Sequence, residues 1–321
     1  MNTTQHRVPI VTVTMNPAID LTVRCQSLQA GAVNRAHAAR IDAGGKGINV
    51  ASVLADWGVA TAATGLLGRT NASVFEALFD RKQIEDRCLR ISGETRTNIK
   101  IVDGDGCTTD LNLPGLAANP GDLRVVADTL DDLCREGGYA VLAGSLPSGL
   151  ADDSYLPLLR AVAARGARAV LDTSGAPLTA ALGAPRELLP YAIKPNRHEL
   201  EAWAGEPLVR TDDLIRAARR LQALGVSLVV VSQGEHGALF VDQHRVLHAG
   251  ISAVAAISSV GAGDAMVAGL TSALLDGADL EGIARRATAF AAAKLGLPGP
   301  HLPDRHAVQR LAADVLVTRL A

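Results

Sequence analysis

One run of the sequence, Val260-Gly-Ala-Gly-Asp264, combines two glycines with a carboxylate at the start of a helix expected near 262–276. Gly261 and Gly263 leave backbone N–H groups uncovered at the helix N-terminus, where unsatisfied donors and the helix dipole attract anionic oxygens. Asp264, inside the first turn, can take a proton from a hydroxyl group that attacks a phosphoryl group held there. The alternative is an ordinary glycine turn in which Asp264 is only a helix N-terminal charge.

A second glycine-rich run is Ala43-Gly-Gly-Lys-Gly-Ile-Asn49. Its glycines let the backbone approach a ligand closely, while Lys46 supplies a positive charge and Asn49 both donates and accepts hydrogen bonds. The run is not a Walker A loop, because Gly47 follows the lysine where Ser or Thr is required. The first strand is not followed by a GxGxxG dinucleotide fingerprint either. A glycine turn with a solvated lysine is the alternative.

A third run, Ile193-Lys-Pro-Asn-Arg-His-Glu-Leu200, closes a strand and opens a helix. Asn196 is placed as a helix N-cap with Glu199 three residues later, which is the pattern of a capping box. That pattern explains both residues without a ligand. The functional alternative places Asn196 and Glu199 near a hydrated Mg²⁺ ion, which retains several of its waters.

Shorter motifs lie where further strands are expected to end. Asp20 closes the run Asn16-Pro-Ala-Ile-Asp20, and Ser145 lies in Gly144-Ser-Leu-Pro147. The carboxyl ends of strands are where open α/β sheets bind ligands. Arg96, in Thr95-Arg-Thr-Asn98, offers a guanidinium suited to a phosphate. The same edge is expected to carry the run Ser232-Gln-Gly-Glu-His-Gly237.

The elements that must position these residues alternate between strands and helices. Short apolar runs bounded by Gly, Ser, Asp or Pro predict strands at Val8–Val13, Tyr139–Ala143, Arg168–Leu171, Leu188–Ile193 and Ser227–Val231. Amphipathic patterns predict helices at 46–57, 71–82, 121–135, 152–164, 196–204 and 211–224, and three more helices near 262–276, 279–295 and 304–319 end the chain. This alternation predicts an α/β fold with a mostly parallel central sheet flanked by helices.

Two regions, residues 15–40 and 95–114, break this rhythm with alternating apolar and polar residues. They are expected to be antiparallel strands that form a small β-sheet lid over the edge of the main sheet. Asp103-Gly-Asp-Gly106 between two such runs indicates a hairpin. Since no linker, repeat or low-complexity tract interrupts the chain, residues 1–321 are expected to form a single domain.

Composition excludes several classes of protein. The 321 residues are 48% hydrophobic and 20% charged, with a formal net charge of -2 and only 3% aromatics. Neither a nucleic-acid partner nor a membrane-surface partner is therefore expected. The four cysteines form no CxxC pair and the eight histidines no metal-binding pattern. With no apolar signal segment and no spanning stretch, a cytoplasmic location is expected.

Taken in order, these motifs resemble the PfkB branch of the ribokinase-like kinases, and the resemblance covers nearly the whole chain. Within that family the bacterial 1-phosphofructokinase group is most similar, through Lys194–Gly205 and Gly31–Asn34. The matching motifs are Asn-Pro-Ala-Ile-Asp, Gly-Gly-Lys-Gly-Ile-Asn, Thr-Arg-Thr-Asn, Gly-Ser-Leu-Pro, Asp172-Thr-Ser-Gly175, Lys-Pro-Asn-x-x-Glu-Leu, Ser-x-Gly-x-x-Gly and Val-Gly-Ala-Gly-Asp.

The resemblance implies a ribokinase-like fold and ATP-dependent phosphorylation of fructose 1-phosphate at C6, which gives fructose 1,6-bisphosphate. Tagatose 6-phosphate and fructose 6-phosphate are alternative acceptors, and a non-catalytic sugar-phosphate-binding regulator is a more distant alternative. The implied cofactors are ATP and Mg²⁺, and the implied assembly is a homodimer through the lid. Implied roles are Asp264 as base; Gly261, Ala262 and Gly263 as anion hole; Asp20, Gly44, Gly45, Lys46, Asn49, Arg96 and Ser145 toward the sugar phosphate; Lys194, Asn196, Ser232, Gly234 and Gly237 toward ATP; and Glu199 toward Mg²⁺ through water.

Three positions depart from the family pattern. Ser259 stands where many relatives carry Thr, which keeps a hydroxyl group, and Gln233 replaces a common Leu. The segment Lys294-Leu-Gly-Leu-Pro-Gly299 lacks the polar residues often found late in relatives. The resemblance therefore does not extend to a bound potassium ion or to the adenine contacts.

Overall fold

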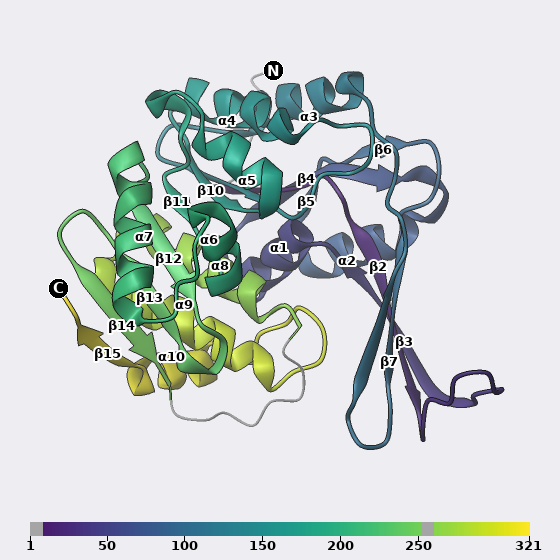
Figure 1. Ribbon diagram of the computed structural model, residues 1–321. Coiled ribbons are helices and arrows are strands. Elements are labelled where there is room, and N and C mark those ends of the chain that lie inside the picture. Colours follow the sequence, from purple (N-terminus) through teal and green to yellow (C-terminus); the bar gives the residue numbers. More distant parts are fainter. Residues whose placement is uncertain (1–8, 252–259) are drawn as a thin grey trace.

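The larger of two sheets runs through the centre of the molecule (Figure 1). The computed structural model describes residues 9–251 and 260–321, so Val8 of the first expected strand and Ser259 lie outside the described residues. Within these ranges the larger sheet has eleven strands. Their order is β15 (Leu316–Arg319), β14 (Val246–Gly250), β13 (Ala238–Val241), β12 (Leu228–Ser232), β11 (Ala192–Ile193), β10 (Arg168–Asp172), β9 (Tyr139–Ala143), β1 (Ile10–Thr14), β4 (Thr61–Gly68) and β5 (Glu85–Asp86), with β6 (Leu89–Ile91) also paired to β4.

The sheet is parallel from β12 to β5, and β13, β14 and β15 add an antiparallel edge. Every residue of β1, β4 and β9 is buried. Strands buried on both faces require a layer of helices on each side, because each face of the sheet is apolar. The mostly parallel central sheet predicted from the sequence is confirmed.

Successive side chains of a strand point into different helical layers. Val11 and Val13 of β1 pack into one layer, while Ile10 packs into the other. None of the described helices has the length and apolar character needed to cross a membrane. The first layer contains α3 (Pro120–Leu133), α4 (Tyr155–Ala164), α5 (Gly175–Leu182), α6 (Arg197–Ala204) and α7 (Thr211–Leu224); the second contains α1 (Lys46–Asp56), α8 (Ala262–Leu275), α9 (Leu280–Leu295) and α10 (Arg305–Asp314); α2 (Ser73–Lys82) packs against α1 and β4.

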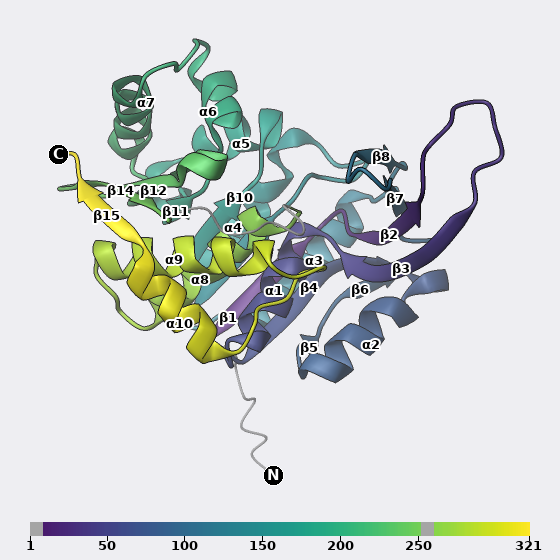
Figure 2. The ribbon, with the colours of Figure 1, turned by 90° about the horizontal axis from the view of Figure 1, so that it is seen from below.

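A smaller four-stranded sheet projects from the body (Figures 1 and 2). The strands β2 and β3 pair antiparallel, and so do β7 and β8, but β2 and β7 pair parallel. The expectation of antiparallel strands throughout was therefore wrong for the central pair. The reason is that β2 and β7 both run outward from the body, each leading into its own return strand. Their bounds are β2 (Ala18–Cys25), β3 (Ala36–Gly44), β7 (Thr97–Val102) and β8 (Thr108–Asn112).

The hairpin between β7 and β8 is confirmed. Oδ1 of Asp103 accepts hydrogen bonds from the backbone N–H groups of Asp105 at 3.1 Å and Cys107 at 2.8 Å. Gly106 has a φ of 81°, a conformation that glycine adopts without steric cost. The side chain and the glycine together fix the turn.

Among the elements that differ from the sequence-based expectations, three have a plain physical reason. The buried strand β4 was missed, because its sequence Thr-Ala-Ala-Thr-Gly-Leu-Leu-Gly is rich in Ala and Gly, which have low strand propensity. The helix expected at 304–319 ends at Asp314, and Leu316–Arg319 forms β15, which pairs with the edge strand β14. The strand expected at Leu188–Ile193 is reduced to its last two residues, since Pro190 has no N–H group for a ladder.

Candidate active site

Four polar side chains gather where parallel strands of the larger sheet end. Asp172 is the last residue of β10, Lys194 directly follows β11, and Ser232 is the last residue of β12. Ser145 lies two residues beyond β9, where its Oγ accepts a hydrogen bond from Nδ2 of Asn16 at 3.0 Å. The carboxyl ends of parallel strands share one edge of the sheet, which is the edge where such sheets bind ligands.

Two helices begin beside this edge, each after a glycine in the left-handed half of φ space. Gly45 precedes α1 with a φ of 113°, and Gly261 precedes α8 with a φ of 82°. Side chains other than hydrogen strain such a backbone. The two helices pack together, and Nδ2 of Asn49 donates a hydrogen bond to Oδ2 of Asp264 at 2.7 Å. The two glycine-rich runs of the sequence therefore meet, side chain to side chain.

The first turn of α8 offers backbone donors. The N–H group of Ala265 donates to the carbonyl oxygen of Gly261 at 2.9 Å, which is the first bond of the helix. The N–H groups of Ala262, Gly263 and Asp264 therefore have no acceptor inside the helix. A Cβ placed on Gly263 would lie 3.5 Å from Nζ of Lys194, so an ammonium group stands beside this turn. Amides and ammonium together can bind an anionic oxygen.

Asp172 lies between two lysines. Its Oδ2 is 3.4 Å from Nζ of Lys46, and its Oδ1 is 3.4 Å from Nζ of Lys194. The carboxylate is buried, and among the described residues neither oxygen receives a hydrogen bond of normal geometry. Sequence analysis used Asp172 only as part of a family motif and gave it no role. A carboxylate at the end of a buried strand, on the ligand-binding edge, was the signal that could have found it.

The charges in this cluster set the proton affinity of Asp264. Burial and the negative charge of Asp172 raise the pKa of Asp264 to about 6, although the Asn49 hydrogen bond and the charges of Lys46 and Lys194 act in the other direction. Burial disfavours the ammonium form of Lys46, but the charges of Asp172, Asp264 and Glu199 outweigh it and raise the pKa of Lys46. Asp264 is thus a carboxylate that can gain and lose a proton near neutral pH.

The base of the smaller sheet borders the same region. Asp20 on β2 accepts a hydrogen bond from Nδ2 of Asn98 on β7 at 3.2 Å, and burial is the main cause that raises the pKa of Asp20. A Cβ on Gly44 would lie 2.3 Å from Oδ2 of Asp20. Nε of Arg96 donates to the carbonyl oxygen of Pro17 at 3.3 Å. The structure therefore brings Asp20, Gly44 and Arg96 together, next to Gly45 and Lys46.

The remaining predicted residues follow β11 and β12. Oδ1 of Asn196 accepts a hydrogen bond from the N–H group of Glu199 at 2.9 Å, and Oε2 of Glu199 accepts one from the N–H group of Asn196 at 2.8 Å. The capping box expected from the sequence is therefore confirmed. Asn196 also forms a β-bridge with Ser232, and beyond it Gly234 and Gly237 have φ values of 62° and 82°. These residues form a strip beside Lys194.

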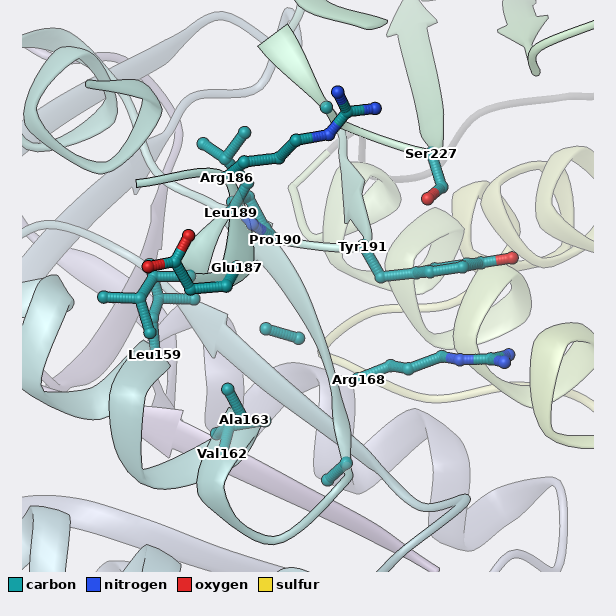
Figure 3. Close-up of a pocket in the computed structure, with 14 residues that line it drawn as sticks. Leu159, Val162, Ala163, Arg168, Arg186, Glu187, Leu189, Pro190, Tyr191 and Ser227 are labelled. Atoms are coloured by element: carbon teal, nitrogen blue, oxygen red, sulfur yellow. The ribbon is translucent and has the colours of Figure 1, made fainter. Parts of the chain in front are cut away.

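A cavity of about 250 Å³ lies elsewhere on the molecule (Figure 3). It opens at the amino ends of β10, β11 and β12, between Arg168, Arg186 and Tyr191, where the guanidinium of Arg168 lies 4.8 Å from the centre of the Tyr191 ring. The cluster of Asp172 and Lys194 occupies the other ends of the same strands. The cavity is therefore separate from the candidate active site.

Comparison with known proteins gives the family. Residues 5–306 match the model of the pfkB family carbohydrate kinases. The chain is 56% identical over 309 residues to a 1-phosphofructokinase of Xanthomonas campestris pv. campestris, covering 96% of this chain and 97% of the relative. It is 47% identical to the 1-phosphofructokinase of Rhodobacter capsulatus, covering 97% and 98%. The chain belongs to the PfkB family of carbohydrate kinases.

A solved structure shares the fold. The phosphofructokinase-2 of Escherichia coli, in complex with potassium, superposes with a TM-score of 0.89 at 29% identity, covering 95% of this chain and 98% of that one. The large, mostly parallel sheet with a smaller separate sheet is thus a ribokinase-like α/β fold, as the sequence predicted.

The raised pKa of Asp264 leads to a prediction about stability. The folded protein retains the proton up to about pH 6, whereas the ordinary value is 3.8. The stability contributed by this proton is complete below about pH 3.8 and is lost as the pH rises through about 6. Asp264→Asn carries no charge, so at pH 8 it should raise the free energy of unfolding by about 2–3 kcal/mol, and by much less at pH 4.

Calorimetric unfolding at both pH values measures this effect. Asp80→Asn, which removes an exposed carboxylate on α2, is the control and should show little difference between the two pH values. A loss of stability in Asp264→Asn at pH 8 would show that the carboxylate is structural.

Proposed function

We propose that this chain transfers the γ-phosphoryl group of ATP to the C6 hydroxyl group of fructose 1-phosphate, giving fructose 1,6-bisphosphate and ADP. The observation that carries the proposal is the buried Asp264, with a pKa raised to about 6, in the first turn of α8. Full-length relatives at 56% and 47% identity that are 1-phosphofructokinases support fructose 1-phosphate as the acceptor.

Asp264 acts as the general base. Its carboxylate, oriented by Asn49, takes the proton of the C6 hydroxyl group while the hydroxyl oxygen attacks the γ-phosphorus. The new P–O bond forms as the bond from phosphorus to the bridging β-phosphate oxygen breaks, and ADP leaves with that electron pair. The amides of the first turn of α8 and the ammonium group of Lys194 stabilise the negative charge on the transferring group.

The acceptor side is formed where the smaller sheet meets the glycine-rich start of α1. Asp20 is held by Asn98 and abuts Gly44, so a sugar hydroxyl can bind there. Arg96 and Lys46 supply fixed positive charge for the phosphate that the sugar already carries. The residues of this side are Asp20, Gly44, Gly45, Lys46, Asn49, Arg96 and Ser145.

The nucleotide side is the strip that follows β11 and β12, formed by Lys194, Asn196, Ser232, Gly234 and Gly237. Among the described residues no group of three or more His, Cys, Asp or Glu side chains is placed to hold a metal ion. This fits Mg²⁺, which keeps several waters and binds substrate phosphates with few protein ligands. Glu199, whose Oε2 is engaged in the capping box, would act on it through water, and the ion would neutralise phosphate charge.

The role of Asp264 predicts both a kinetic defect and a pH profile. Asp264→Asn should lower kcat by about a hundredfold or more and leave ATP affinity largely intact, because only the proton acceptor is lost. In the wild type, kcat/KM should fall about tenfold per pH unit below about pH 6, since protonated Asp264 is inactive.

The phosphate of the substrate also titrates near pH 6, so the profile needs a control. Asn49→Ala removes a hydrogen bond that lowers the pKa of Asp264, so it should move the acid limb to higher pH. If the acid limb of the pH profile does not move in Asn49→Ala, the group that titrates is the phosphate of the substrate and not Asp264. Near-normal turnover in folded Asp264→Asn would contradict the assignment of the base.

The acceptor is tested by comparing kcat/KM for fructose 1-phosphate, fructose 6-phosphate and tagatose 6-phosphate. Fructose 1-phosphate should be preferred clearly, and Arg96→Ala should raise its KM about tenfold or more while changing the KM for ATP much less. A preference for either 6-phosphate would contradict the assignment of fructose 1-phosphate as the acceptor, but not the assignment of the chain as a kinase. Binding of sugar phosphate without ADP release would instead indicate a regulator.

We also propose that the smaller sheet pairs with a second copy of the chain. One row of paired residues crosses all four strands and is apolar: Ile41, Leu21, Ile99 and Leu111. The adjacent row, on the opposite face, is polar: Asp42, Asp20, Asn98 and Asn112. The polar face borders the acceptor side, whereas Ile41 and Leu111 of the apolar row are 59% and 51% exposed. An exposed apolar face of this kind favours association.

The combined change Ile41→Lys and Leu111→Lys should therefore convert a dimer into a monomer, because it places two charges in the row that the dimer would bury. Sedimentation equilibrium measures the mass. Val125→Lys, which changes an exposed apolar residue of α3, is the control and should leave the dimer intact. A wild-type chain that sediments as a monomer would contradict the proposal.

A further inference from the structure

A buried lysine lies at the end of α9. Lys294 is the second-last residue of the helix, and its side chain is 0% exposed. Its ammonium group donates a hydrogen bond to the carbonyl oxygen of Leu297 at 2.9 Å, in the loop that leads to α10. An ammonium group taken out of water is costly unless polar groups surround it. The bond to Leu297 therefore lets this buried ammonium group hold the loop against the end of α9.

The side chain of Lys294 lies against the start of α8. A Cβ placed on Gly261 would be 3.4 Å from Cε of Lys294. Burial and the charge of Arg40 lower the pKa of Lys294, while the charges of Asp264 and Asp42 oppose this. Arg40 and Asp42 form an ion pair on β3 at 2.7 Å. The ammonium thus stands behind the glycine turn, within the electrostatic reach of Asp264 and of the smaller sheet.

An anion hole works through donors that are fixed before the reaction. Gly261 is held at a φ of 82° and contributes little stiffness by itself, because glycine adopts many conformations. A cation behind the turn, bonded to the carbonyl oxygen of Leu297, can hold the turn and the neighbouring loop in one arrangement. A small free cation such as K⁺ binds carbonyl oxygens in the same way as an ammonium group does, but an ammonium on a side chain cannot diffuse away.

We propose that Lys294 is a positioning residue for the Gly261–Gly263 anion hole, a tethered cation that makes phosphoryl transfer independent of free monovalent cations. The inference rests on the proposed function of this turn. It is consistent with residues 295–299, which carry no polar side chain and so offer a free ion only their backbone carbonyls.

The chain offers a matched control in Lys82 of α2. Its Nζ lies 2.7 Å from Oδ1 of Asp56, 2.7 Å from Oγ of Ser52 and 3.0 Å from Nδ1 of His301. Oγ of Ser52 in turn donates to the carbonyl oxygen of Pro300 at 2.7 Å. Lys82 is therefore a second largely buried ammonium that fixes the same loop, but from the side of α1 and α2.

The test measures kcat for the wild type, Lys294→Ala and Lys82→Ala in buffers whose monovalent cation is K⁺, NH₄⁺, Na⁺ or tetramethylammonium. The wild type should vary less than about twofold. The kcat of Lys294→Ala should fall about tenfold or more in tetramethylammonium, because this cation is too large to occupy the space left by the lysine side chain. With K⁺ or NH₄⁺ the kcat of this variant should recover. Its KM for fructose 1-phosphate should stay unchanged. Lys82→Ala should lower Tm without any response of kcat to the cation.

Three results would overturn the proposal: wild type activated about tenfold by K⁺, Lys294→Ala with full kcat in tetramethylammonium, or a loss in Lys294→Ala that no cation restores. If Lys294→Ala does not fold, Lys294→Met keeps the volume of the side chain and should lose kcat in every buffer. The wild-type kcat measured with each cation can then still overturn the proposal. A wild type without kinase activity would instead refute the proposed function.

Discussion

The site depends on one electrostatic balance, in which two buried carboxylates share one region with two ammonium groups. Burial and the charge of Asp172 raise the pKa of Asp264, whereas the charges of Lys46 and Lys194 lower it. Their combination sets the pKa of Asp264 close to neutrality. Each member comes from a different element, so the balance exists only when β10, β11, α1 and α8 meet at one edge of the sheet.

Glycines in and near the two glycine-rich runs serve the packing of the helices as well as the proposed ligand contacts. A Cβ on Gly47 would lie 2.5 Å from the carbonyl oxygen of Val13 and 2.5 Å from Oγ1 of Thr14, so α1 rests directly on the end of β1. A Cβ on Gly269 would lie 2.9 Å from Cα of Ala287, so α8 rests equally closely on α9. Close packing of this kind tolerates no added methyl group, and it keeps Asn49 within hydrogen-bonding distance of Asp264.

Sequence patterns predicted the layers, the smaller sheet and the regions that meet at the site, because periodicity and glycine-rich runs are local signals. They did not predict β4, whose Ala and Gly residues become a strand only through pairing between β1 and β5. The place of Asp172 between two lysines was also not predicted, since these lysines lie 126 residues before it and 22 residues after it. The end of α10 was missed because β15 forms only where β14 offers an unpaired edge.

The parallel pairing of β2 with β7 has a mechanical consequence. It joins two hairpins from distant parts of the chain into one continuous sheet, since six consecutive residue pairs link Ile19–Arg24 to Thr97–Val102. Any movement of this sheet would therefore displace both hairpins together, and at its base the N–H group of Ile19 donates to the carbonyl oxygen of Arg96 at 2.7 Å. Asp20 and Asn98, joined by their hydrogen bond across these two strands, would therefore keep the same relative position, and the proposed acceptor side would move as one piece.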